Sequence, residues 1–254
     1  MPIPLGYTEN LITPKSDRNV EAYWTHVAKG SGDSLILPDG RCDIILRFNE
    51  HHSKPPTPIV TGPSTIPYTV SFSTGDTWLG MRLRPTRGAL LWKKRILMSE
   101  NSVLREQDAI KLVPELFQLN RVGLNYSDFK RVLEPIFSVN VVSTNQPMLD
   151  AAVDLIHLGG GRMNIDDLAT HVGCSARHLN RLFRQSNGLS AKAYSQLVRF
   201  HRGLRLIVQE RHAISHASIE AGYTDQAHLT RSFRRFGGFT PSNLPSDLSI
   251  PTLF

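Results

Sequence analysis

The sequence predicts an α+β chain of two domains: a β-rich N-terminal domain that also contains helices, and an all-α C-terminal domain. Its 254 residues suit two domains of roughly 100–200 residues each. Two-residue alternation over residues 34–85 indicates strands, and helical periodicity replaces it beyond residue 99. The composition, with 40% apolar residues, 20% charged residues and two cysteines, excludes a wholly disordered, collagen-like or disulfide-scaffold protein.

Residues 34–85 are interpreted as strands because apolar residues alternate with others between turn residues. The clearest strand is residues 79–84, which read LGMRLR. A second is predicted over residues 42–48, CDIILRF, directly after the turn sequence PDGR at residues 38–41. These patterns favour a β-rich domain.

An amphipathic helix is predicted near residue 130, with Ser127 as its cap and a bend at Pro135. Its apolar residues have helical spacing and are Phe129, Val132, Leu133, Ile136 and Phe137. Such a stripe suits either a dimer partner or the helix's own domain, and we favour packing on its own domain.

The domain boundary is predicted at residues 142–147, VSTNQP, which lack periodicity and carry turn residues. The expected organisation is a β-rich domain over 1–140, a linker over 141–147, a helical domain over 148–245 and a tail over 246–254.

The helical domain contains an internal repeat of two units, residues 168–184 and 217–234. Equivalent residues are 49 positions apart before the turn and 50 apart after it. Each unit reads as a short helix, a turn containing Gly, and a second helix that begins at a cap, Ser175 or Asp225. This is the helix-turn-helix plan.

The second helix of each unit has an outward face of residue types that read DNA bases. In the first unit this face carries Arg177, Asn180, Arg181 and Arg184, and in the second Gln226, Ala227, Thr230, Arg231 and Arg234. Arg pairs with guanine, and Asn or Gln with adenine, through two hydrogen bonds in the major groove. An ordinary polar surface explains either face alone, but two matched faces after matched turns favour DNA reading.

Charge and spacing favour the same partner. Residues 177–235 hold 11 basic residues, ten of them Arg, against three acidic ones, which suits a polyanion. One helix over residues 190–208 would be about 30 Å long, close to the ~34 Å between successive major grooves on one face of DNA. Gly203 within it predicts close approach of another backbone.

Residues 148–244 resemble the DNA-binding domain of AraC/XylS-family bacterial transcription regulators. The resemblance is carried by residues 165–169, 175–183 and 188–190, by Tyr194, Arg199 and Arg202, and by residues 221–226, 233–235 and 238–241. It implies double-stranded DNA as partner, with bases read by Arg177, Asn180, Arg181, Gln226, Ala227 and Arg231. Backbone or helix-face contacts are expected from Ser175, Arg184, Thr224, Thr230, Arg234 and Arg202, although Arg202 equally fits a structural ion pair.

The second unit departs from the family pattern. Ala217 and Ser218 replace an Ile-Ala pair, Gly237 replaces an aromatic residue, and Leu244-Pro245 replaces an aromatic-Arg pair. Ala227 makes no bidentate base contact. The second unit is therefore expected to pack more loosely and to contribute less specificity than the first.

Residues 34–98 resemble the cupin-like barrel domains that precede this DNA-binding domain in many family members. The resembling residues are 38–40, Asp43, 62–63 and 80–85. The resemblance implies a sensor or dimerisation domain, with Arg82 and Arg84 as candidates for binding an anionic effector. No metal site is expected, because the residues His26, Cys42, His51 and His52 lack metal-ligand spacing. Cys42 is interpreted as a core residue.

The favoured function is therefore sequence-specific transcription regulation, with no enzymatic activity and no cofactor. Catalytic motifs such as a Gly-rich phosphate loop are absent from the sequence. The alternative is a metal-dependent cupin-type enzyme fused to a DNA-binding tail. A sequence-indifferent architectural protein is disfavoured by Asn180 and Gln226.

The expected partners besides DNA are a small-molecule effector, a second copy in a homodimer, and RNA polymerase if the chain activates transcription. The N-terminus lacks a signal-peptide pattern, and no window of about 18 apolar residues spans a membrane. The expected location is the cytoplasm.

Overall fold

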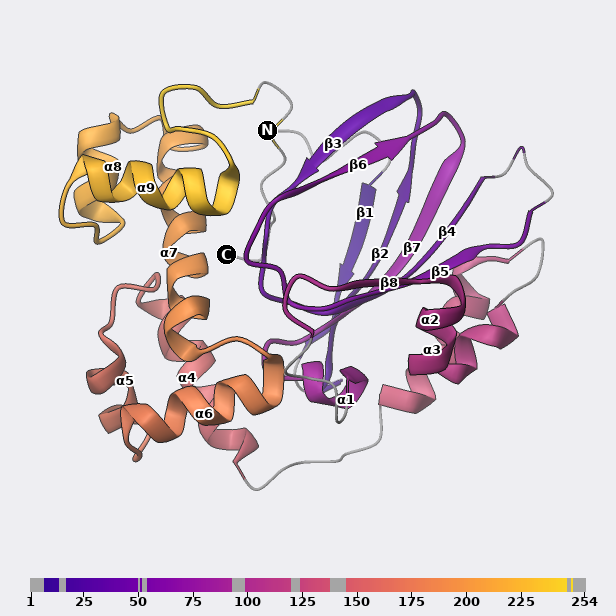
Figure 1. The fold of residues 1–254 in the computed structure, drawn as a ribbon, viewed down its shortest axis with the longest axis horizontal. Helices are drawn as coiled ribbons and strands as arrows, with labels where there is room; N and C mark the ends of the chain where they lie inside the picture. The colour runs from indigo at the N-terminus through magenta and orange to yellow at the C-terminus, as the bar shows by residue number, and fades with distance from the viewer. Residues whose placement is uncertain are drawn as a thin grey trace.

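The computed structural model places a β-rich N-terminal domain beside a helical C-terminal domain, which confirms the predicted fold class (Figure 1). It describes residues 7–13, 17–49, 51, 54–92, 99–119, 124–137, 145–245 and 248. The strands are β1 (Tyr7–Leu11), β2 (Val20–Val27), β3 (Gly32–Ile36), β4 (Asp43–Asn49), β5 (Thr57–Thr61), β6 (Tyr68–Phe72), β7 (Asp76–Leu83) and β8 (Val103–Arg105).

The strands form a six-stranded sheet of order β1-β2-β7-β4-β5-β8 and a separate pair, β3-β6, with antiparallel pairing throughout. The two strands with the clearest alternation, β4 and β7, are neighbours, and Ile45 pairs with Gly80. β1 and β8 are the edges of the larger sheet among the described strands. The β-rich prediction is confirmed, whereas the described strand pairs form an open sheet rather than a closed barrel.

Helices cover one face of the larger sheet (Figure 1). They are α1 (Gly88–Trp92), α2 (Glu106–Leu112), the 3₁₀-helix η2 (Pro114–Leu119) and α3 (Tyr126–Phe137). Phe129, Leu133 and Phe137 of α3 are buried against the sheet core, so the apolar stripe packs on its own domain as predicted. The cap was predicted two residues too late: Asn125 rather than Ser127 accepts the Asp128 backbone N–H, at 2.9 Å.

The helical domain has the two predicted units and their connector. Its helices are α4 (Gln146–Leu158), α5 (Ile165–His171), α6 (Ala176–Asn187), α7 (Ala191–Val208), α8 (Ile214–Glu220) and α9 (Gln226–Gly237). The starts of α5 and α8 are 49 residues apart, and those of α6 and α9 are 50 apart. Ser175 and Asp225 cap α6 and α9 by accepting from the backbone N–H groups of His178 and His228. The repeat, both caps and the connecting helix are therefore confirmed.

The predicted linker lies partly outside the described residues, which omit 141–144. Gln146 and Pro147, assigned to the linker, instead belong to the first turn of α4. Proline fits there because the first helical turn lacks backbone acceptors for its N–H groups. Arg87 of the N-terminal domain pairs with Asp150 of α4 at 2.8 Å, so the two domains are in contact next to this segment.

The turn at residues 37–41 inserts into the helical domain. Leu37 is buried in the apolar cluster of α7, α8 and α9. Gly40 has φ +69, and a Cβ there would lie 3.1 Å from the Tyr194 ring and 3.2 Å from Leu197. A left-handed conformation in so tight a space requires glycine.

Backbone carbonyls of the same turn accept hydrogen bonds from the helical domain. The Asn187 amide donates to the Gly40 carbonyl at 2.8 Å, and His201 Nε2 lies 2.7 Å from the Pro38 carbonyl. Asn187 ends α6 and His201 lies at the middle of α7. The turn therefore holds the N-terminal domain against both α6 and the connecting helix α7.

The second unit completes its core with residues from outside its two helices. The Phe239 ring lies where a side chain at Gly237 would stand, 2.7 Å from an added Cβ. Leu37 from the N-terminal domain and Leu248 from the tail also join this core, and Ala217 is fully buried. The looser packing expected from the sequence is thus offset by these neighbours.

Gly203 approaches side chains rather than a backbone, contrary to the prediction. An added Cβ would lie 3.5 Å from Phe233 and 3.6 Å from Ala221 and Leu229, which is ordinary van der Waals contact. Gly203→Ala is therefore expected to raise the free energy of unfolding by about 0.5–1 kcal/mol, because alanine has the higher helix propensity. Thermal unfolding measures this, with Gly161→Ala as the control expected to destabilise: its Cβ would lie 2.2 Å from the Ser195 carbonyl. A lower melting temperature for Gly203→Ala would contradict the expectation.

Candidate nucleic-acid interface

The outer face of α6 presents arginines to solvent. Arg177, Arg181 and Arg184 are exposed, while Leu179, Leu182 and Phe183 on the opposite face are buried. The Arg181 guanidinium contacts His178 Nδ1 at 3.1 Å and Gln185 Oε1 at 3.3 Å, both at the surface. These weak surface contacts leave the arginine face accessible to a nucleic acid.

Asn180 differs from its arginine neighbours because its amide is already engaged. Its Nδ2 donates to the Ala176 carbonyl at 2.9 Å, and its Oδ1 accepts from the Lys192 backbone N–H at 3.4 Å. The side chain is half-buried and links α6 to the start of α7. Asn180 would have to release both contacts before it bound a base, so its role as a base reader stays a prediction.

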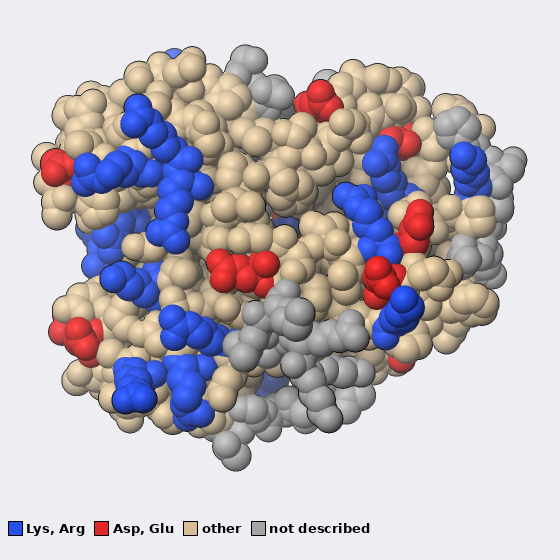
Figure 2. Space-filling view, viewed as in Figure 1, with Lys and Arg blue, Asp and Glu red and all other residues tan. Residues whose placement is uncertain are grey.

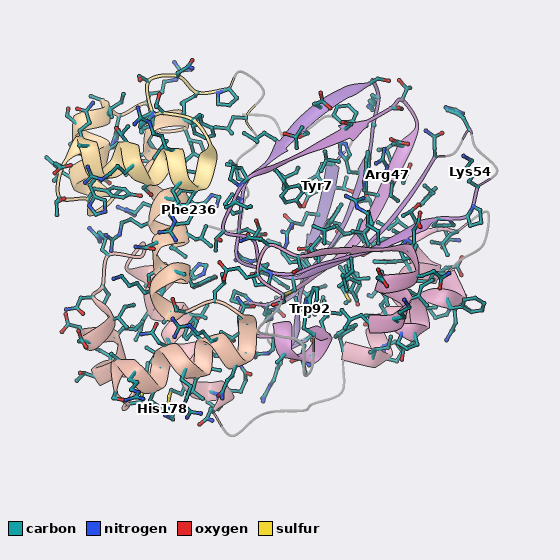
Figure 3. The ribbon with its side chains drawn as sticks, viewed as in Figure 1. Tyr7, Arg47, Lys54, Trp92, His178 and Phe236 are labelled. Carbon is teal, nitrogen blue, oxygen red and sulfur yellow. The ribbon has the colours of Figure 1, made fainter. Side chains whose placement is uncertain are left out.

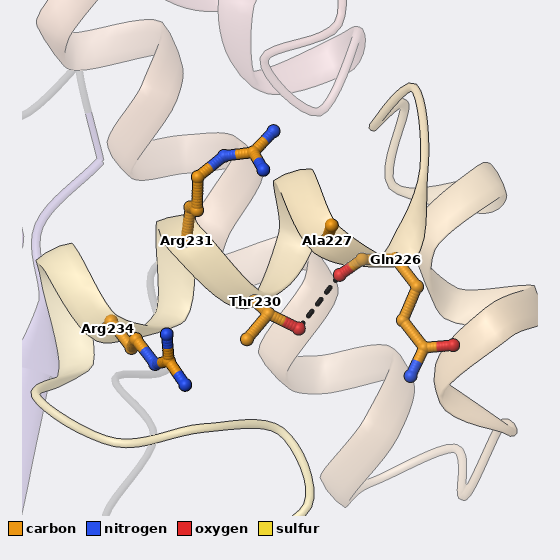
Figure 4. Close-up of a pocket in the computed structure, with 5 residues that line it drawn as sticks. All are labelled: Gln226, Ala227, Thr230, Arg231 and Arg234. Atoms are coloured by element: carbon orange, nitrogen blue, oxygen red, sulfur yellow. Dashed lines mark hydrogen bonds between the residues drawn. The ribbon is translucent and has the colours of Figure 1, made fainter.

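The outer face of α9 forms a shallow open concavity (Figure 4). Its lining residues are Gln226, Ala227, Thr230, Arg231 and Arg234, the same five that the sequence assigns to the outward face of the second unit. Thr230 Oγ1 donates to the Gln226 backbone carbonyl at 2.8 Å. Gln226 itself is exposed. The concavity therefore offers one amide and two guanidinium groups around the methyl group of Ala227.

Ser175 and Thr224 precede α6 and α9, and both make contacts with the first turn of the helix that follows. Ser175 Oγ accepts the His178 backbone N–H at 3.2 Å, and Thr224 Oγ1 lies 3.2 Å from His228 Nδ1. Ser175 and Thr224 are exposed. Their expected contacts with the DNA backbone stay predictions, and the positions beside exposed helix N-termini are consistent with phosphate binding.

The connector α7 carries one unit at each end (Figure 1). Its 18 residues span about 27 Å. Arg199 in its middle donates to the carbonyls of Gly161 and Gly222, at 2.6 and 3.3 Å, and so links the turn between α4 and α5 to the turn between α8 and α9. Lys and Arg side chains gather over both units on the face shown in Figure 2.

Arg202 fits the structural alternative rather than a phosphate contact. Its guanidinium lies 3.3 Å from Glu220 Oε1, and its Nε donates to the Glu220 carbonyl at 3.4 Å. Its stem packs on Gly160, where an added Cβ would lie 2.5 Å from Arg202 Cδ. The side chain is one-quarter exposed and connects α7 to α8.

Arg202→Ala is expected to lower the free energy of unfolding by about 1–2 kcal/mol, because hydrogen bonds to Glu220 and stem packing are lost. The salt dependence of DNA binding should stay unchanged, since no phosphate contact is removed. Thermal unfolding and DNA affinity at several salt concentrations measure both effects. Arg205→Ala is the control, because Arg205 lies 4.0 Å from Glu210 at the surface and its loss should cost less. A shallower salt slope for Arg202→Ala would indicate a phosphate contact instead.

Arg82 and Arg84, the candidate effector-binding pair, have different partners and do not form one anion site. Arg82 pairs with Glu9 at 2.8 Å and lies 3.4 Å from Asp43 and 3.6 Å from Asp39. Arg84 donates to the backbone carbonyls of Ile12 and Asp17.

Around Arg82, carboxylates outnumber guanidinium groups. Tyr7, which is labelled in Figure 3, stacks on Trp24. The Trp24 indole donates to Asp43 at 2.9 Å. Burial raises the pKa of Asp43 to about 6, and Arg82 opposes that rise. This surplus of carboxylates disfavours an anionic effector at Arg82. The prediction that Arg82 and Arg84 together bind such an effector is therefore not supported.

Cys42 is buried, and burial raises the pKa of its thiol well above the usual range. A buried protonated thiol is unreactive, which agrees with a core role. His52 lies outside the described residues. Among the described residues, the cluster of His and carboxylate side chains with metal-ligand geometry lies in the helical domain, at His212, His216 and Glu220.

Two segments of the chain match known domain families. Residues 168–245 match a family described as a helix-turn-helix domain. Residues 14–104 match a family described as a domain of unknown function (DUF6597). The N-terminal match leaves the cupin-like prediction and its ligand untested.

Curated relatives are transcription regulators of bacteria. The chain is 23% identical over 154 residues to the Msm operon regulatory protein of Streptococcus mutans, covering 60% of this chain and 53% of that protein. It is 28% identical over 130 residues to the regulator GbdR of Pseudomonas aeruginosa, covering 51% and 34%. It is 30% identical over 86 residues to the Arabinose operon regulatory protein of Escherichia coli, covering 34% and 30%. The chain thus spans about half or less of the length of these relatives.

Two solved structures of other proteins also resemble parts or most of this chain. A transcriptional regulator with an AraC-type DNA-binding domain from Chromobacterium violaceum is 30% identical, covers 39% of this chain and 88% of its own, and has a TM-score of 0.36. ToxT from Vibrio cholerae, in a complex with a naphthalenyl butenoic acid, is 10% identical, covers 93% and 97%, and has a TM-score of 0.45.

The two units, their capped second helices and the connector α7 define a bipartite helix-turn-helix domain. A relative at 30% identity, of which this chain covers 88%, has an AraC-type DNA-binding domain. The C-terminal domain of this chain is an AraC-type helix-turn-helix domain. No helix in the described part of the chain is both long and apolar enough to cross a membrane.

Proposed function

We propose that the protein is a sequence-specific transcription regulator whose helices α6 and α9 read two successive major grooves of DNA. The observation that carries the proposal is the matched pair of basic outward faces at the two ends of α7. A rigid connector of about 27 Å is near the ~34 Å repeat of the major groove. Bacterial DNA lies in the cytoplasm, so the proposal locates the protein there.

The residues of the two faces have different tasks under this proposal. Arg177, Arg181 and Arg231 suit guanine, and Gln226 suits adenine. Ala227 offers its methyl group to thymine, since apolar contact with the thymine methyl is a further means of base recognition. Arg184 and Arg234, each one turn further along its helix, suit phosphates at the groove edge.

The N-terminal domain is proposed to bias DNA binding, by a small-molecule effector or by homodimer formation. The turn at residues 37–41, which contacts α6 and α7, provides a physical link between the domains. An effector coupled through it would change DNA affinity about 5- to 150-fold. RNA polymerase is the further partner if the protein activates transcription.

Arg181→Ala is expected to weaken binding to the best DNA site by ~1–3 kcal/mol and to relax the preference at one or two base pairs. Selection of duplexes from a random pool with the full chain identifies that site, and footprinting on it should show protection in two successive major grooves. Affinity is then measured on this site and on a scrambled duplex. Specific binding should fall much more than nonspecific binding.

Arg131→Ala is the matched control, because Arg131 is an exposed arginine on α3 of the N-terminal domain, outside both reading faces. Its removal should leave the affinities for both duplexes unchanged. Equal losses on the two duplexes for Arg181→Ala would assign Arg181 to the DNA backbone. Protection of one groove alone would overturn the role proposed for α7.

A further inference from the structure

Three potential metal ligands converge beside the turn between α7 and α8, on a part of the second unit that the DNA-reading proposal does not use. His212 precedes α8, His216 lies within it, and Glu220 is its last residue. The ligand atoms of all three side chains lie within 4.8 Å of one another. His216 and Glu220 are four residues apart and lie on one face of α8, and the turn before the helix brings His212 close to them.

The distances suit a shared metal ion. His212 Nδ1 lies 3.2 Å from Glu220 Oε2. Two ligand atoms on one ion lie about 3.0–3.6 Å apart when each bond is ~2.0–2.2 Å. The rings of His212 and His216 have centroids 4.8 Å apart, and His216 is exposed, so a side-chain rotation brings its nitrogen to the same point.

A second observation points to a ligand at this position. His212 Nδ1 is buried, yet it makes no hydrogen bond. A buried polar atom without a hydrogen bond is costly and unusual. The nearby Glu220 oxygen is within ion-pair distance but lacks hydrogen-bond alignment with this nitrogen. A cation between the two atoms would satisfy both.

The surrounding charges would orient two of the three ligands. Glu210 Oε2 lies 3.8 Å from His212 Nε2, the ring nitrogen that faces away from the proposed ion. Arg202 lies 3.3 Å from Glu220 Oε1 and leaves Oε2 for the ion. A carboxylate beside the distal nitrogen of a ligating histidine, and a hydrogen-bonded ligating carboxylate, are recurring features of metal sites.

We propose that His212, His216 and Glu220 bind one divalent transition-metal ion of the Zn²⁺, Ni²⁺ or Cu²⁺ class. Two imidazoles favour these ions over Mg²⁺ and Ca²⁺, which prefer oxygen ligands. Three protein ligands leave at least one coordination position for water. The ion would attach the turn before α8 to the face of α8, and so stabilise the helix that precedes the turn into the reading helix α9.

The test is metal binding by the full chain in the absence of DNA, so its result is independent of the proposed function. Metal-stripped protein is titrated with Zn²⁺ against a chromophoric chelator, and with Co²⁺ as a spectroscopic probe of coordination geometry. One ion per chain is expected. His216→Ala should weaken binding by at least about 10-fold, because removal of a ligand exceeds the 10–100-fold cost typical of changing its hydrogen-bonded neighbours.

His171→Ala is the matched control, because His171 is an exposed histidine on α5, the equivalent helix of the first unit. It should bind Zn²⁺ as the unchanged chain does. Zn²⁺ should raise the melting temperature of the unchanged chain and of His171→Ala, but not of His216→Ala. Equal Zn²⁺ affinity for all three proteins would overturn the proposal and would locate any bound ion elsewhere in the chain, as the cupin-type enzyme alternative requires.

Discussion

Arg41→Met is expected to lower the free energy of unfolding by about 3–5 kcal/mol, because it removes one partner of a buried ion pair and leaves the other charge unpaired. The Arg41 side chain is 1% exposed, and its Nε lies 2.5 Å from Glu21 Oε2. It also donates to the Asp39 carbonyl at 3.1 Å, within the turn that contacts the helical domain. The melting temperature should fall by ~10 °C or more.

Two further variants separate the buried charge from other causes of instability. Arg47→Met removes the guanidinium of a half-buried pair with Asp76 and should cost at most about 1 kcal/mol. Glu21→Leu combined with Arg41→Met removes both buried charges and should recover much of the loss, since apolar replacement of a whole buried pair is often close to neutral. If Arg41→Met lowered the free energy of unfolding no more than Arg47→Met, the buried charge of Arg41 would not be what stabilises the turn at residues 37–41.

The helical domain was predictable because its signals are local. Caps such as Ser175 and Asp225, the glycines of the turns and the 3.6-residue periodicity all act within a few residues. The repeat doubled each signal, because the helices of the second unit follow those of the first at offsets of 49 and 50 residues. The five residues lining the α9 concavity were identified in the same way, from their positions on one helix face.

The N-terminal domain was less predictable because its contacts are distant in sequence. β1 and β2 were missed, because Tyr7–Leu11 is a mixed polar edge strand without a clear alternation of apolar residues. The shortest ion pair of Arg82 is with Glu9, 73 residues away. The contact between Pro38 and His201 joins residues 163 apart. Nothing local in the sequence indicates such pairings.

Asn180 and the cluster of His212, His216 and Glu220 show how residue type can mislead or be overlooked. Asn180 has the base-reading amide, but asparagine also bonds backbone groups of its own helix, and the Ala176 carbonyl is four residues back. The histidines of the second unit were passed over, although His212, His216 and Glu220 have a four-residue spacing that is visible in the sequence. The convergence of their ligand atoms depends on the turn before α8, which periodicity does not describe.

The buried His201 and the half-buried His157 are expected to make stability depend on pH. Burial lowers the pKa of His201 to about 4, and burial together with the nearby charge of Arg41 lowers the pKa of His157 to about 3. His201 meets the Pro38 carbonyl, and His157 Nε2 lies 2.8 Å from the Tyr194 hydroxyl. Both side chains are therefore neutral in the folded chain, whereas in the unfolded chain they titrate near pH 6.5.

The direction of the effect follows from proton uptake. Between pH 6.5 and about 4 the unfolded chain binds protons that the folded chain does not, so the free energy of unfolding falls as the pH falls. Asp43 acts in the opposite direction: its folded pKa of about 6 exceeds the ordinary value of 3.8, so the folded chain takes up this proton first and gains stability below pH 6. Because two histidines lower the free energy of unfolding in acid and one carboxyl raises it, the net effect of these three groups is a loss of stability as the pH falls.

Denaturant unfolding from pH 7 to pH 4 should therefore show a steep loss of stability that His201→Gln reduces. Glutamine keeps a donor for the Pro38 carbonyl but takes up no proton, so this variant should lose on the order of 2–3 kcal/mol less than the unchanged chain over that range. His171→Gln, at an exposed position, should follow the unchanged chain. If His201→Gln and the unchanged chain lost stability in parallel, protonation of His201 would not be what weakens the fold in acid, and the loss would have to come from the remaining titrating groups, with His157 first among them.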